Sequence, residues 1–354
     1  LSGLEASIGG AYILTNADKT TTFPFIDHKF ALNALLAALK NLVDEIKSLQ
    51  AAAIRVVHGD LTLTEPALII SDMRSKIFDW PPSAPPHSPQ NLAAIDGLNQ
   101  IAPEQPQFAS FDTSFHTTNS DVTTRYTIPR MMETKGIRRY GFHGLSYAPF
   151  VKYLHEIFRE RLPLRLLAFH FGNKASLCAF HNGQSIATTI GYWPLDGLTM
   201  GTRSGGIDAY AVLSLVEGNG LERAKAILNH ESELLDLSRV KSDMRNLMLD
   251  PSADSGFAIE YFCNWSLRPA GSRIAAMEMI DVISSTGGTR ENALRVSACI
   301  LRGLEWTGLR VNYDANRRND VRLDAQSSKV KAWVIPAKED QILPTDALTL
   351  TGTT

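Results

Sequence analysis

The chain has 354 residues, of which 44% are hydrophobic and 20% charged, as in a globular protein with a buried core. This length usually folds as two domains. The 35 Lys and Arg residues nearly balance the 37 Asp and Glu residues, so the net charge of −2 offers no bulk attraction to nucleic acid or to an anionic membrane. We therefore expect neither nucleic acid nor membrane as a partner.

The cysteines indicate the compartment. Cys178, Cys263 and Cys299 lie far apart and form no CxxC or Cys/His metal spacing. No signal peptide pattern or membrane-length apolar run is visible. Together these features favour a reducing, cytoplasmic location. The first residue is Leu1 rather than Met, which indicates that the natural start lies upstream.

The first hundred residues predict a sheet with covering helices. Residues 1–30 are turn-rich and β-like, and apolar residues at helical spacing predict a helix over 31–49. Residues 53–58 predict a buried strand that carries Arg55. A buried arginine needs an anionic partner, so Arg55 either forms an internal ion pair, which is the commoner case, or binds a ligand.

The next segment holds two candidate site residues. Five prolines within residues 81–89 exclude a regular helix or a central strand there. A helix is predicted over 91–101 and a strand over 107–111. Asp112 follows that strand, where open α/β sheets bind ligands, although it could equally cap a turn. His143 lies in a tight turn and could be a site residue or a structural histidine.

Residues 168–208 hold the densest set of site-like features. An apolar run ends in His170, a glycine-bearing loop follows, a strand–turn–strand pattern surrounds residues 182–183, and Arg203 lies in a glycine-rich segment. Glycine lets backbone N–H groups approach a phosphate closely. The same pattern describes a hairpin with ordinary turn glycines, and the pattern alone favours the hairpin.

The remaining chain predicts alternating helices and strands. We expect helices over residues 210–216, 221–235, 257–279 and 291–304, strands over 281–285 and 330–335, and a loop over 238–245. A Gly-Gly pair at 287–288 separates a strand from a helix. That arrangement can place a phosphate at the helix N-terminus, but any parallel crossover can also use glycines there.

Taken in order, seven motifs resemble the acetate kinase (acetokinase) family. They are RVVHG (55–59), FDTSFH (111–116), IRRYGFHG (137–144), HFGNKAS (170–176), PLDGLTMGTRSGGID (194–208), SDMR (242–245) and TGGTREN (286–292). The wording GFHGLSY, with Leu145 and Tyr147 where bacterial members usually have Thr and His, is similar to eukaryotic and especially fungal members.

The resemblance implies an α/β fold with two ribonuclease-H-like domains of the actin/hexokinase/Hsp70 (ASKHA) type and an active-site cleft between them. Domain I is expected at residues 1–113 plus 340–354. Domain II is expected at 114–339, with the nucleotide side and the interface of a homodimer.

The resemblance also implies residue roles. Arg55 and Arg203 match two arginines that hold the carboxylate and the transferring phosphoryl group, for which planar guanidinium forks are suited. His143 matches a histidine that donates a hydrogen bond to that phosphoryl group. Asp112 matches an acidic residue that aligns substrate or Mg²⁺, and Glu339 a glutamate linked to Mg²⁺.

Two further sets of positions follow from the motifs. The pocket for the substrate's methyl group is implied to include Val57, Pro86, Phe142 and Pro194. Pro86 stands where the family commonly has leucine, which leaves the preferred chain length open. The nucleotide side is implied to include His170, Gly172, Asn173, Lys174, Asp243, Arg245, Gly287, Gly288 and Arg290.

The sequence departs from the family in three places. It lacks the Asn-x-Gly-Ser-Ser-Ser-x-Lys loop with which members open, as expected of a fragmentary start or of a truncated protein. Lys174 and Arg290 each replace a glycine. Their charge could hold phosphates more tightly, their bulk could fill the adenosine pocket and favour pyrophosphate, or both side chains could point into solvent.

The function implied is that of an acetate kinase, which transfers the γ-phosphoryl group of ATP to acetate with Mg²⁺ and yields acetyl phosphate and ADP. The alternatives are a kinase for propionate or another short-chain carboxylate, a pyrophosphate-dependent variant, and a catalytically impaired nucleotide-binding relic.

Overall fold

The computed structural model describes residues 10–16, 19–25, 50–79, 87–158, 165–172, 174–239, 242–286, 294–335 and 339–352. The chain divides into two compact units, Leu1–Phe111 with Leu343–Thr354, and Asp112–Ile342. The expected helix over 31–49 lies outside the described residues. The roles expected for the two domains stay predictions.

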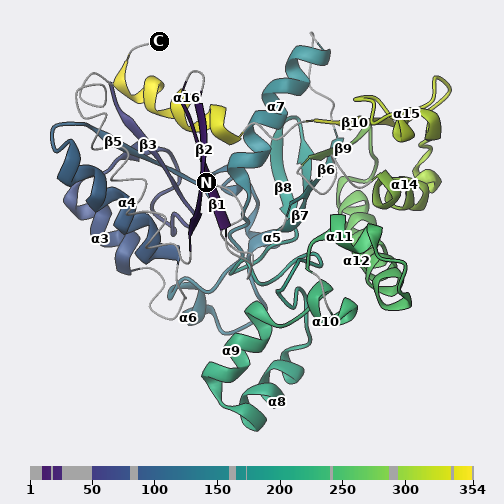
Figure 1. The fold of residues 1–354 in the computed structure, drawn as a ribbon, viewed down its shortest axis with the longest axis horizontal. Helices are drawn as coiled ribbons and strands as arrows, with labels where there is room; N and C mark the ends of the chain where they lie inside the picture. The colour runs from purple at the N-terminus through teal and green to yellow at the C-terminus, as the bar shows by residue number, and fades with distance from the viewer. Residues whose placement is uncertain are drawn as a thin grey trace. The chain divides into compact units, whose positions relative to one another are not determined.

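The first unit is built on short strands covered by helices (Figure 1). Its elements are β1 (Gly10–Asn16), β2 (Lys19–Phe25), β3 (Ala52–Val56), β4 (Ala67–Leu68), β5 (Gln107–Phe111), α3 (Ser71–Asp79) and α4 (His87–Ile101). β1 and β2 form an antiparallel hairpin, and β3 runs parallel to β5, which pairs with β4. Ile54, Val56, Ile95 and Phe111 lie in the shared core. The strands expected near 53–58 and over 107–111 are confirmed.

The proline-rich segment is less irregular than expected. α4 begins at His87 and includes Pro89 as its third residue. Proline is tolerated in the first turn of a helix because the N–H groups there have no partner inside the helix. The exclusion of helix over residues 81–89 is therefore wrong for the last three positions.

The chain ends in a helix that returns to the first unit. α16 (Glu339–Thr351) was not expected from the Thr-rich tail. In this unit the Ser110 hydroxyl donates a 2.7 Å hydrogen bond to the Asp346 carboxylate. Burial raises the pKa of Asp346.

The second unit is built on a five-stranded sheet in the order β10-β9-β6-β7-β8. The strands are β6 (Arg165–Phe171), β7 (Ala175–His181), β8 (Gln184–Thr188), β9 (Val282–Thr286) and β10 (Lys331–Val334). β10, β9 and β6 run parallel, while β7 and β8 are antiparallel to their neighbours. The strands expected over 281–285 and 330–335 are confirmed within a residue or two.

Both faces of this sheet are buried. Leu166, Ala168, Cys178 and Phe180 pack with α7 (Gly144–Phe158), whereas alternate residues such as Leu167, Phe169, Leu177 and Ala179 pack with α12 (Ala253–Met277). Successive side chains of a strand point to opposite faces, so one hairpin serves both cores. Figure 1 shows α7 and α12 on opposite sides of the sheet.

The strand–turn–strand pattern near residue 182 is confirmed. Asn182 and Gly183 both have positive φ, 50° and 80°, as a two-residue hairpin turn of type I′ requires. This turn joins β7 to β8.

The remaining elements of the second unit surround the sheet. They are η1 (Ser114–His116), α5 (Asp121–Thr124), α6 (Arg130–Glu133), α8 (Ala209–Asn219), α9 (Leu221–His230), α10 (Leu234–Ser238), α11 (Met244–Leu249), α14 (Leu294–Gly303), η2 (Glu305–Thr307) and α15 (Tyr313–Arg317). The helix expected over 221–235 is divided into α9, which ends at His230, and α10, which begins after Glu233; the φ of 58° at Glu233 is incompatible with a continuous helix. None of the helices in the described ranges is long and apolar enough to cross a membrane.

Candidate active site

His143 lies in a tight turn that leads into α7. Its φ is 61°, in the left-handed region that few residues other than glycine occupy. The next residue, Gly144, donates its backbone N–H to the carbonyl oxygen of Asp112 at 2.9 Å. A Cβ atom at position 144 would lie 2.3 Å from that oxygen, so only glycine fits. The turn therefore fixes His143 beside the backbone of Asp112, the residue that follows β5.

The His143 side chain is buried in a polar cluster against the sheet. Its Nδ1 lies 2.7 Å from the Ser176 hydroxyl, which lies 2.7 Å from the Tyr147 hydroxyl. The His170 ring is 4.5 Å from the His143 ring, centroid to centroid. His170 and Ser176 are opposite each other in the β6–β7 ladder and so share a face of the sheet. The HFGNKAS segment thus supplies two members of the cluster from one hairpin.

A second histidine, His116, hydrogen-bonds the backbone of the same turn. His116 is buried, and its Nε2 lies 2.9 Å from the carbonyl oxygen of Phe142 while its Nδ1 lies 2.8 Å from the Ser185 hydroxyl. Burial lowers the pKa of His116 to about 4, so the ring is neutral at pH 7. Because a carbonyl only accepts, Nε2 carries the proton and donates it. The FDTSFH motif contained this residue, but sequence reasoning assigned it no role.

Two residues of the predicted methyl pocket, Phe142 and Pro194, lie next to Trp193. The Phe142 ring packs edge-on against Trp193 with centroids 6.4 Å apart. The next residue, Pro194, is buried, and its carbonyl oxygen accepts a 3.0 Å hydrogen bond from Nη1 of Arg203. The structure therefore brings Phe142, Pro194 and Arg203 together, with Trp193 as a lining residue that the sequence did not single out.

Glu233 supports the loop that carries Arg203. Its carboxyl group accepts a hydrogen bond from the backbone N–H of Met200. A Cβ atom at Gly205, whose φ is 64°, would lie 2.5 Å from Oε1 of Glu233. Burial raises the pKa of Glu233 to about 9. Sequence reasoning missed this residue, since it lies outside every motif.

Residues predicted on the nucleotide side are only partly connected to this cluster. Gly172 donates its N–H to the carbonyl oxygen of Lys174 at 3.1 Å and closes the loop after His170. Asp243 caps α11 and its carboxylate is paired with the Arg245 guanidinium at 2.5 Å. No contact within the described ranges links that pair to His143 or His170. Their nucleotide role stays a prediction.

Candidate residues of the first unit lie on or just after β3. Ile54 and Val56 are buried, whereas Arg55 is exposed on the opposite face of the strand. The expectation of a buried arginine is therefore wrong, because side chains alternate across the strand. The Asn91 amide donates to the backbone carbonyl of Arg55. Val57 is half-buried after the strand ends.

Several predicted residues cannot be placed. Glu339 begins α16, but its side chain lies outside the described structure. The other positions outside the described residues are Pro86, Asn173, Gly287, Gly288 and Arg290. Within the described ranges, no three or more His, Cys, Asp or Glu side chains form a group able to hold a metal ion.

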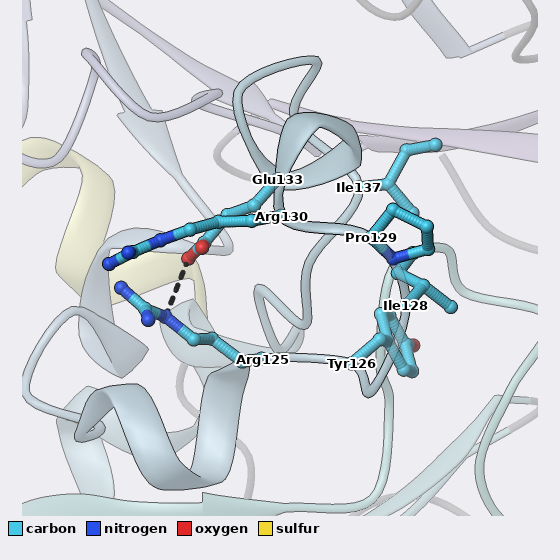
Figure 2. Close-up of a pocket in the computed structure, with 7 residues that line it drawn as sticks. All are labelled: Arg125, Tyr126, Ile128, Pro129, Arg130, Glu133 and Ile137. Carbon is cyan, nitrogen blue, oxygen red and sulfur yellow. Dashed lines mark hydrogen bonds and ion pairs between the residues drawn. The ribbon is translucent and has the colours of Figure 1, made fainter.

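A cavity of about 340 Å³ lies near α6 and was not expected from the sequence (Figure 2). Its lining includes Arg125, whose Nε donates to the Glu133 carboxylate at 3.1 Å. Another lining residue, Tyr126, accepts a hydrogen bond from the backbone N–H of Tyr192, next to Trp193. Tyr126 therefore lines this cavity and also hydrogen-bonds the segment that leads to Trp193 and Pro194.

Comparison with known proteins supports the motif assignment. The Acetokinase family profile matches residues 6–345. This chain belongs to the acetokinase family. It is 36% identical over 296 residues to the acetate kinase of Rickettsia typhi, an alignment that covers 83% of this chain and 77% of that protein.

Solved acetokinase-family structures share the fold. The Porphyromonas gingivalis acetate kinase superimposes with a TM-score of 0.85 at 28% identity, covering 97% of this chain and 90% of that one. A propionate kinase from Francisella tularensis gives 0.86 at 28% identity, covering 94% and 87%. The expected two-domain α/β architecture of the ASKHA type is confirmed.

Proposed function

We propose that this acetokinase-family chain transfers the γ-phosphoryl group of ATP to acetate, reversibly, giving acetyl phosphate and ADP. The observation that carries the proposal is the His143 turn. A histidine is held at φ 61° and buried next to Phe142, whose ring packs on the segment that anchors Arg203. Backbone strain of this kind persists only where the surrounding structure enforces it, and it is concentrated at functional sites.

The chemistry needs positioning and positive charge more than proton transfer. A carboxylate oxygen of acetate attacks the γ-phosphorus, and the bond from that phosphorus to the bridging oxygen of ADP breaks. Acetate is already ionised at neutral pH, so no general base is required. Charge spreads over the transferring phosphoryl oxygens, where hydrogen-bond donors stabilise it. Arg203 and His143 are the donors we assign.

We propose that Asp112 and Glu339 are the residues that would hold Mg²⁺. Kinases commonly hold Mg²⁺ through one or two carboxylates, and the substrate phosphates supply the other ligands. Asp112 provides a buried carboxylate directly after β5, and Glu339 is the second acidic residue we assign. When bound, Mg²⁺ would neutralise charge on the nucleotide phosphates.

The preferred carboxylate is a finer question. Phe142 and Trp193 contact each other and Pro194 is buried beside them, an apolar wall that suits a short alkyl group. One methylene changes the discrimination by only about 1–3 kcal/mol. Propionate is the second candidate, favoured by the similarity to the Francisella tularensis propionate kinase.

The decisive experiment traps acyl phosphate as its hydroxamate in mixtures of acetate, ATP and Mg²⁺. We expect product with acetate and a weaker signal with propionate. A folded protein that forms no hydroxamate with any short carboxylate would contradict the proposal. Repeating the assay with pyrophosphate, and with Lys174→Gly, tests whether Lys174 alters the choice of phosphoryl donor.

We also propose that the chain forms a homodimer through its second unit and acts in the cytoplasm. Ile207, Tyr210, Leu213 and Leu221 expose apolar side chains on and around α8, and Tyr210 is 79% exposed. Grouped apolar residues of this kind are typical of protein interfaces. Light scattering coupled to size-exclusion chromatography would measure the mass in solution, and a mass of one chain would contradict the dimer.

A further inference from the structure

Tyr147 lies one helical turn after His143. The carbonyl oxygen of His143 accepts the backbone N–H of Tyr147 at 3.1 Å, as in the first turn of a helix. Residues four apart lie on the same helix face, so the two side chains point to the same part of the sheet. There the Ser176 hydroxyl lies 2.7 Å from the Tyr147 hydroxyl and 2.7 Å from Nδ1 of His143.

All three groups are removed from water. Tyr147 and Ser176 are each 0% exposed, and His143 is 4% exposed. Buried polar groups in proteins are almost always hydrogen-bonded, so each proton in this cluster needs an acceptor. Burial raises the pKa of the Tyr147 phenol well above its ordinary value, which keeps the phenol protonated at physiological pH.

The phenol proton has one acceptor among its described contacts. That acceptor is the Ser176 oxygen, 2.7 Å from the Tyr147 hydroxyl. The phenol proton must then go to the Ser176 oxygen. A serine hydroxyl carries a single proton, which is left to point at Nδ1 of His143.

We propose that Tyr147 and Ser176 are positioning residues that hold neutral His143 in the tautomer with its proton on Nε2. The chain of donors runs from the Tyr147 hydroxyl to the Ser176 hydroxyl, and from the Ser176 hydroxyl to Nδ1 of His143. His143 then presents an Nε2–H group, and this group donates to the transferring phosphoryl oxygen. The last step rests on the proposed kinase function, whereas the tautomer does not.

The opposite direction of hydrogen-bond donation is disfavoured by the same count of donors and acceptors. If Nδ1 of His143 donated to Ser176, the serine proton would turn toward the Tyr147 oxygen. The buried phenol proton would then have no acceptor among the described contacts. The hydrogen-bond partner of one ring nitrogen sets which nitrogen carries the proton, so the tyrosine controls the histidine without touching it.

The direct test is nitrogen NMR of ¹⁵N-histidine-labelled protein. The chain has nine histidines, and the His143 signals are identified by their loss in His143→Gln. We expect the wild-type protein to show a neutral His143 ring with the proton on Nε2. In Tyr147→Phe the Ser176 hydroxyl no longer accepts a proton from the phenol, so it can either donate to Nδ1 of His143 or accept from it. The two tautomers of His143 should then both be populated. A wild-type ring protonated on Nδ1, or an unchanged tautomer in Tyr147→Phe, would overturn the inference.

Kinetics supply the second readout. We expect kcat to fall about tenfold in Tyr147→Phe with little change in KM. The Nε2–H of His143 stabilises the transferring phosphoryl group in the transition state, and it does not contribute to binding of the substrate before the reaction. The matched control is Tyr140→Phe. Tyr140 is also buried, and its hydroxyl donates to the Gly136 carbonyl at 2.8 Å, away from the imidazole of His143. Its kcat should stay near that of the wild type, and an equal loss in both variants would refute the assigned role.

Ser176→Ala gives an independent variant if Tyr147→Phe folds poorly. Removing the serine leaves Nδ1 without its donor, and the same mixture of tautomers is expected. A wild-type protein with the Nε2–H tautomer but no hydroxamate product would contradict the kinase proposal and support the tautomer assignment. The failures of the two proposals are therefore distinguishable.

Discussion

The His116 ring donates a hydrogen bond from Nε2 to the carbonyl oxygen of Phe142, 2.9 Å away, one residue before His143. His116 also packs against Gly141, where a Cβ atom would lie 2.6 Å from the ring. The buried imidazole thus holds the backbone of the turn that presents His143. We infer that it positions the site without contacting substrate.

Replacing His116 with Phe should therefore lower activity while leaving the ring volume similar. The Phe142 carbonyl would lose its buried donor, at a cost of about 1–3 kcal/mol in the free energy of unfolding. A shift of the turn by about 1 Å could reduce kcat by about 100-fold. His116→Gln keeps an amide donor and should retain more activity. Equal kcat values for the two variants in the hydroxamate assay would argue against the positioning role.

Glu233 predicts an unusual pH dependence of stability. Its pKa is raised from 4.5 to about 9 by burial. Between those values the folded state keeps a proton that the unfolded state has released, so the free energy of unfolding falls as pH rises, by at most about 1.4 kcal/mol per pH unit. Glu233→Gln has no carboxyl group to titrate, so this fall in the free energy of unfolding is absent in the variant. Compared with wild type, the variant should gain stability between pH 5 and pH 8 in urea unfolding.

The control for that experiment is Glu231→Gln. Glu231 is exposed and pairs with Arg223, which holds the pKa of Glu231 below its usual value. This variant should show no gain as pH rises. A Glu233→Gln curve parallel to wild type across this range would mean that Glu233 is ionised in the folded protein.

Gly144→Ala should displace the His143 turn. The new Cβ would lie 2.3 Å from the Asp112 carbonyl oxygen, a backbone atom that cannot rotate away. We expect a loss of several degrees in Tm and a large fall in kcat. Gly218→Ala is the matched control, since nothing lies within 4 Å of its Cβ position in α8. That variant should be stabilised by about 0.5–1 kcal/mol. Similar effects at both positions would refute the steric argument.

Local sequence patterns predicted the elements that frame the site. The run of buried residues over 107–111 defined β5, and the Asn-Gly pair at 182–183 defined the turn between β7 and β8. Both depend on residues that are neighbours in the chain. The alternation of side chains along β3 is equally local. We expected every residue of that strand to be buried, and this expectation placed Arg55 on the buried face when its side chain lies on the exposed one.

Relationships between distant segments were beyond sequence reasoning. The Tyr147–Ser176 contact joins residues 29 apart, and the Glu233–Met200 contact joins residues 33 apart. The first depends on how α7 docks on β7, and the second on the unusual backbone of Glu233. Neither the register of β6 with β7 nor that backbone can be read from propensity, so the motifs identified His143 and Arg203 without their supports.

Arg203→Ala tests the assigned chemistry most directly. The Arg203 guanidinium is half-buried and donates a hydrogen bond to the Pro194 carbonyl oxygen. Losing the cation should reduce kcat by about 100- to 1,000-fold, as expected for removal of a donor to the transition state. Thermal unfolding should change little, because the loop is also held by Glu233. Arg203→Lys keeps the charge but loses the planar fork, and it should recover only part of the activity. Unchanged kcat in Arg203→Ala would show that another group stabilises the transferring phosphoryl.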